Sequence, residues 1–115
     1  MASGAPSQAA EQRGLPVGFT VYPGAELVSD DPIETKAGSG QIITMTTRAS
    51  PVEVAQFYQR QAERAGIPIG SSTRTEGMMV LGGARPDGAR FDLTAAQMGD
   101  GGTSANLMVI DGPQG

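Results

Sequence analysis

The chain has 115 residues, including 17 glycines and only five aromatic residues, and its formal net charge is −4. A single domain of this length buries roughly two thirds of its unfolded surface, so we expect a modest core of aliphatic side chains and methionine. The eight Lys and Arg residues are scattered, which argues against a nucleic-acid-binding protein, because phosphate backbones require clustered cations. Cysteine and histidine are absent, which excludes disulfides, thiolate nucleophiles and the usual zinc sites, and removes the commonest general base.

The first 14 residues contain only small, polar and proline side chains after Met1. Such a composition cannot repay the entropy lost on ordering, so residues 1–14 are predicted to be a disordered tether. One hypothesis is that Met1 replaces an export signal removed from the native protein; the alternative is an ordinary frayed terminus. One domain is expected over residues 15–112, followed by a disordered tail at 113–115.

The segment before residue 50 favours extended structure. In chain order we expect an extended segment at residues 19–22, a turn at 23–24 and a short strand at 25–29. That strand should end at residues 30–32, and a glycine-rich loop should follow at 36–40. Residues 41–49 are rich in β-branched side chains and predict a second strand. Its alternation places Ile43 and Met45 on one face and Ile42 and Thr44 on the other.

A single helix is predicted over residues 51–65. Ser50-Pro51-Val52-Glu53 has the pattern of a capping box with proline in the first turn, and Gly66 supplies a left-handed exit. Apolar side chains recur at three- and four-residue steps, at Val54, Phe57, Tyr58, Ala62 and Ala65. This stripe suits a helix that covers one face of a sheet.

The remainder of the chain reads as strands joined by tight turns. Strands are predicted at residues 67–74, 78–82, 89–98 and 103–110, with turns at 85–88 and 99–102. Pro68 cannot donate to a ladder, so the first of these strands should start late or lie at an edge. The fold class is therefore α+β: one amphipathic helix on a mostly antiparallel sheet of five or six strands, in the order ββαβββ(β).

Three patterns that could indicate a site are better explained as structure. The glycine-rich loop at 82–88 joins two strands and lacks a following lysine, so we interpret it as a turn and not as a phosphate cradle. Asp87, Asp100 and Asp111 lack the spacing of a calcium loop, and the acidic patch at 30–34 is interpreted as solvated. We therefore expect no catalytic residues, no metal site and no cofactor.

Two surfaces are candidate binding sites. Arg90, Asp92 and Thr94 alternate with Phe91, Leu93 and Ala95, so they should form a polar patch on the exposed face of the sheet, or simply a salt-bridged solvent face. A groove beside the helix, near Tyr58 and Met78, is the alternative, because methionine lines adaptable binding surfaces as well as filling gaps in a core.

Two passages resemble small bacterial envelope domains that are often exported or lipid-anchored and largely of unknown function. The residues Val21–Val28, VYPGAELV, resemble a "YPGA" strand, and Ser50–Tyr58, SPVEVAQFY, resemble an "SPEEVADFY" helix start. The resemblance covers about half of the chain and implies no catalytic residues. It implies a periplasmic or envelope-anchored location, with contact to the membrane only through a lipid anchor that would have been removed from this chain.

Together these observations predict a monomeric, non-enzymatic binding or interaction module of the bacterial cell envelope. Its partner would be a protein or a small ligand of the envelope, and not a nucleic acid. The alternative is a small-molecule or anion-binding domain that uses the groove beside the helix. A carboxylate-based hydrolase that uses Asp92 is a third, less favoured reading.

Overall fold

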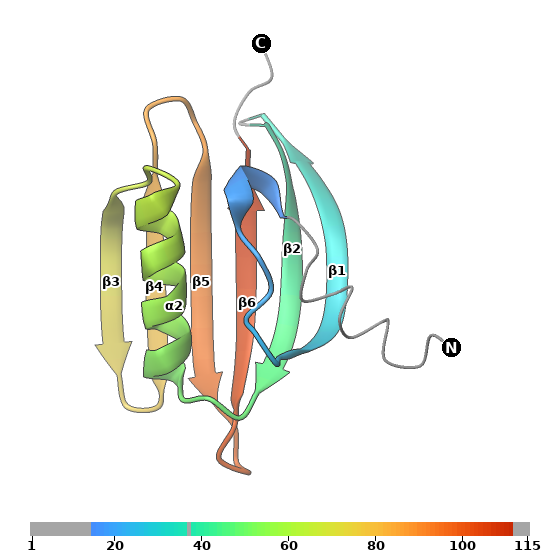
Figure 1. Cartoon of the computed structure of the whole chain (residues 1–115), viewed down its shortest axis with the longest axis vertical. Coiled ribbons are helices and arrows are strands. Elements are labelled where there is room, and N and C mark those ends of the chain that lie inside the picture. Colours follow the sequence, from blue (N-terminus) through green and yellow to red (C-terminus); the bar gives the residue numbers. More distant parts are fainter. Residues whose placement is uncertain (1–14, 37, 112–115) are drawn as a thin grey trace.

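A computed structural model describes residues 15–36 and 38–111. The elements follow one another as η1 (Pro16–Gly18), β1 (Glu26–Thr35), β2 (Gly38–Thr47), α2 (Pro51–Arg64), β3 (Ile69–Thr75), β4 (Met78–Ala84), β5 (Arg90–Gln97) and β6 (Thr103–Ile110). The six strands form one antiparallel sheet in the order β1-β2-β6-β5-β4-β3 (Figure 1). The α+β class and the order of elements are confirmed. The predicted tether at 1–14 and tail at 113–115 lie outside the described residues.

The helix begins and ends where its sequence signals lie. The Ser50 side chain accepts a hydrogen bond from the Glu53 backbone N–H at 3.2 Å, and the Glu53 carboxylate accepts one from the Ser50 N–H at 3.0 Å. Gly66 follows the helix with a φ of 78°, a conformation that glycine adopts without the strain of a Cβ. Local hydrogen bonding therefore fixes where this helix begins and ends.

One face of the sheet is covered by two segments. Helix α2 lies over β4 between β3 and β5, and the segment from η1 to β1 crosses the half formed by β6 and β2 (Figure 1). Three aromatic side chains are fully buried where these segments meet the sheet: Phe19 from the segment before β1, Tyr58 from α2 and Phe91 from β5. The Phe19 ring centroid lies 5.3 Å from that of Phe91 and 6.3 Å from that of Tyr58. The other face of the sheet has no covering element among residues 15–36 and 38–111 (Figure 1).

Residues 19–22 lie outside any helix or strand, and Phe19 and Val21 are buried in the core. The prediction for the segment before β2 is wrong at two places. Strand β1 does not end at residues 30–32 but continues to Thr35, because Pro32 lies on an edge strand, where a missing N–H need not break a ladder. The loop expected at 36–40 is shorter, since β2 begins at Gly38.

Gly40 shows why the start of β2 is rich in glycine. It pairs with Ile33 on β1 and Ile110 on β6, and a Cβ at this position would collide with the Val109 carbonyl oxygen. Only glycine allows the two strands to approach so closely here.

Candidate functional site

The uncovered face of the sheet carries the polar patch expected on β5. The Arg90 guanidinium lies 3.1 Å from the Asp92 carboxylate, and their side chains are 48% and 47% exposed. Thr94 pairs in register with Asn106, which in turn pairs with Thr44, and the Thr44 hydroxyl donates to the Asn106 side-chain oxygen at 2.7 Å. The structure thus brings Arg90, Asp92 and Thr94 together on one face; their role in binding stays a prediction.

Tyr58 does not lie in a groove, and its place in the candidate site is corrected. Its side chain is fully buried, and its hydroxyl donates to the Thr20 carbonyl at 2.7 Å, with the Met45 sulfur 3.6 Å away. Burial raises the pKa of the Tyr58 hydroxyl well above its ordinary value, so the group stays protonated. The helix turns this residue onto its core face, where it ties α2 to the segment before β1.

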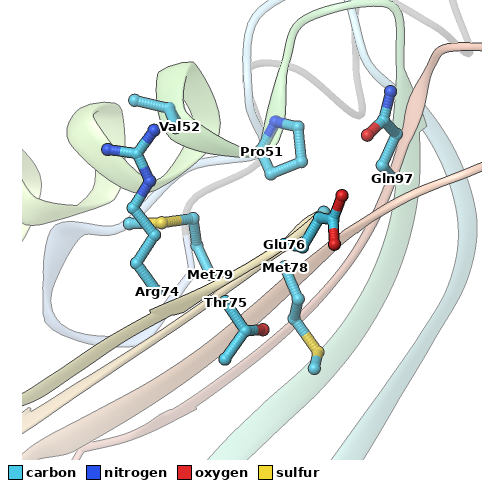
Figure 2. A pocket seen from close by; sticks show the side chains of 9 residues that line it. Pro51, Val52, Arg74, Thr75, Glu76, Met78, Met79 and Gln97 are labelled. Carbon is cyan, nitrogen blue, oxygen red and sulfur yellow. The ribbon is translucent and has the colours of Figure 1, made fainter.

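A groove of about 530 Å³ lies instead at the start of the helix. It is formed by the first turn of α2, the turn between β3 and β4 and the end of β5, and is lined by Pro51, Val52, Arg74, Thr75, Glu76, Gly77, Met78, Met79 and Gln97 (Figure 2). Arg74 and Met79 pair across β3 and β4 and extend toward the helix, whereas Met78 and Thr75 extend away from it (Figure 2). Met78 is 38% exposed and lies at the rim.

The polar groups of this groove are separated along its length. Arg74 lies beside Val52 at one end, and Glu76 and Gln97 lie toward the other end beyond Pro51 (Figure 2). Among the described residues, neither Arg74 nor Glu76 forms an ion pair. The groove therefore offers a cationic end, an apolar floor and an end that can accept hydrogen bonds.

A second groove of about 580 Å³ lies at the same end of the sheet. It is lined by the turn at Pro23 and Gly24, the end of β2 and the turn before β6, including Arg48, Met98 and Asp100. Asp100 accepts a hydrogen bond from the Gly102 N–H at 3.0 Å, so part of its bonding capacity already serves the turn, as the sequence predicts. Neither groove includes Arg90, Asp92 or Thr94.

In the glycine-rich segment at 82–88, residues 82–84 end β4 and residues 85–88 form the turn to β5. The Asp87 carboxylate accepts hydrogen bonds from the Ala89 backbone N–H at 3.1 Å and from the Arg85 guanidinium, and these partners hold its pKa below the ordinary range. An ionised carboxylate in this position opposes anion binding.

Residues 15–36 and 38–111 contain no group of three or more acidic side chains placed to hold a metal ion. In the same part of the chain, no helix has the length and apolarity needed to cross a membrane.

Sequence reasoning missed most of the groove. It identified Met78 but not Arg74, Val52 or Gln97, because these residues come from three segments that meet only after folding. One signal was available: Glu76-Gly77 between two extended runs is typical of a two-residue hairpin, which places the strands on either side of it next to each other.

A family model described as START domain-like matches residues 27–106, from β1 into β6. None of the curated proteins matches the sequence.

Proposed function

Because the chain belongs to the START domain-like family, we propose that it is a ligand-binding module whose ligand occupies the groove between α2 and the β3–β4 turn. Domains of this family generally bind ligands and do not catalyse reactions, which favours binding over chemistry here. The observation that carries the proposal is the groove itself, with an exposed arginine that has no ion-pair partner among the described residues. We use the name helix-start groove for the site lined by residues 51–52, 74–79 and 97.

The chemistry of the groove suggests a small amphipathic molecule. An anionic group would pair with the Arg74 guanidinium, which can donate two parallel hydrogen bonds to a carboxylate or phosphate. An apolar body would lie against Val52, Pro51 and the adaptable Met79 side chain, which packs against the core from β4. Donor groups of the ligand would face the Glu76 carboxylate and the Gln97 amide oxygen.

The test is a titration of the ¹⁵N-labelled protein with a panel of small organic acids, followed by amide chemical shifts. We expect a compact set of shifts at residues 51–52, 74–79 and 97, and a loss of affinity of about tenfold in Arg74→Gln, the loss of one charge-assisted contact. Arg60→Gln, an exposed charge change on α2 outside the groove, is the matched control and should bind as the wild type does. Shifts elsewhere, or equal affinity in Arg74→Gln, would contradict the assignment.

The polar patch on β5 is the second candidate surface. It is favoured by the half-exposed Arg90–Asp92 pair on a sheet face that no described element covers. A protein partner there would shift amides over residues 90–94 and their neighbours on β6 and β4, a wider area than a small ligand affects. The same spectra therefore separate the two surfaces.

We place the module in the bacterial cell envelope, supported by the resemblance of residues 21–28 and 50–58 to exported domains. Fractionation of cells that express the native gene should find the domain in the periplasmic or membrane fraction. Recovery only with cytoplasmic proteins would oppose this location.

A further inference from the structure

The two edge strands of the sheet differ in how well they are protected. An edge strand presents unpaired backbone groups, and proteins block such edges with bulges, proline and charge. Strand β1 has all three: a register shift between Leu27 and Ser29, Pro32 in its middle, and four acidic residues along its length. Strand β3 has one bulge, between Ile69 and Ser71, and a single charged residue, Arg74.

We propose that the outer edge of β3 binds an extended segment of another protein as an additional strand. Six of the seven residues of β3 are exposed, and no strand pairs with its outer side within residues 15–36 and 38–111 (Figure 1). This site shares the Arg74 and Thr75 side chains with the helix-start groove but differs from it in using the outward backbone groups of β3. Strand addition is a common mode of peptide recognition at a sheet edge.

The register identifies which backbone groups are available. Glu76 and Gly77 form a two-residue turn, and in such a hairpin the flanking pair, here Thr75 and Met78, is hydrogen-bonded. Hydrogen-bonded and non-bonded pairs alternate from there, so Ser72 and Arg74 belong to non-bonded pairs and direct their N–H and C=O groups away from β4. Two adjacent outward sites, past the bulge, are enough to pair a short peptide.

The side chains of β3 indicate the chemistry of that peptide. The Cβ atom of a peptide residue directly opposite Arg74 would lie about 5 Å from the Arg74 Cβ atom. Asp or Glu is favoured at that position, because its carboxylate could pair with the guanidinium. Thr73 and Thr75 lie on the uncovered side, where β-branched residues pair well across strands. We therefore expect an acidic residue on the helix side, alternating with Thr or Val on the other side.

A second copy of this chain fits the edge less well. Pairing β3 with itself would place no acidic side chain opposite Arg74, because Ile69–Thr75 contains none. The strand also offers little apolar surface to bury, since Ile69 is its only large apolar residue and is already half-buried. Charge complementarity thus favours an acidic peptide over a dimer.

The experiment selects short displayed peptides on the folded protein and compares two changes at one position. Ser72→Pro removes the outward N–H while leaving the bonds to β4, and Ser72→Ala keeps the N–H and removes only the hydroxyl. We expect acidic, β-branched peptides whose affinity falls at least about tenfold in Ser72→Pro and in Arg74→Glu but not in Ser72→Ala. Thermal melting checks that each variant folds.

A change in the peptide makes the test independent of protein stability. Two versions of a selected peptide would be compared, one methylated at its odd-numbered backbone nitrogens and the other at its even-numbered ones. Methylation should abolish binding in one version and spare it in the other, because only one of the two sets of N–H groups faces β3. Failure to select any peptide, or equal binding to Ser72→Pro and Ser72→Ala, would overturn the proposal. A wild-type dimer in sedimentation that Ser72→Pro dissociates would also overturn it, by making the second copy the occupant.

Discussion

Phe91, Leu93 and Ala95 are fully buried on β5, whereas Arg90, Asp92 and Thr94, which alternate with them, lie on the side of the sheet that no described element covers. The first set packs beneath α2 and the segment that precedes β1, so its contribution is apolar burial at close packing. The second set holds a solvent-exposed ion pair, which contributes little to stability. The comparison shows that stability depends on one face, which leaves the other free for recognition.

The largest expected effect is a difference in the free energy of unfolding between two variants at adjacent residues on opposite faces of β5. Leu93→Ala should lower the free energy of unfolding by about 2–5 kcal/mol, because it leaves a cavity in a fully buried site. Thr94→Ala should lower the free energy of unfolding by less than about 1 kcal/mol, because the substitution removes only a β-branched side chain and its surface contacts. Urea denaturation of both variants measures the difference. Equal losses would mean that the uncovered face is buried in solution.

A smaller effect is expected at the link between the helix and the segment before β1. Tyr58→Phe removes the donor to the Thr20 carbonyl and should cost about 1–2 kcal/mol, measured in the same way. Tyr22→Phe is the control, because Tyr22 is half-buried and its ring packs edge-on against Phe57. A similar cost in both variants would contradict the assigned role of the Tyr58 hydroxyl.

The same hydroxyl predicts a dependence on pH. Burial raises the pKa of Tyr58 in the folded state, so above the ordinary tyrosine value of about 10 the unfolded chain binds fewer protons than the folded one. Stability should therefore fall as the pH rises past that value. The fall should be steeper in the wild type than in Tyr58→Phe, as judged by melting temperature across the alkaline range. Parallel curves would show that the hydroxyl is accessible to water.

The smallest effect is expected for the ion pair on the uncovered face. Arg90→Ala, Asp92→Ala and the double variant should each change stability by less than about 1 kcal/mol, with a coupling energy near zero at physiological salt. Urea denaturation of the three variants measures the coupling. A coupling well above this value would show that the pair is shielded from solvent, which would make it part of the structure and not a surface open to a partner.

Much of the fold could be predicted because its signals are local. The capping box at Ser50 and Glu53, the turns at 85–88 and 99–102 and the alternation along β5 act over a few residues, and the structure confirms each of them. The extension of β1 through Pro32 was missed because the effect of a proline depends on whether its strand lies at an edge. An edge is a property of the sheet and not of the segment.

The sequence by itself determined the helix, the turns and the two faces of the later strands, since backbone hydrogen bonding and side-chain alternation need no distant partner. Only the tertiary structure decided that β6 joins β2, that the Tyr58 hydroxyl meets the Thr20 carbonyl, and that Arg74, Val52 and Gln97 meet in one groove. These contacts join residues far apart in the chain. Their energy comes from how segments pack together, which no single stretch of sequence contains.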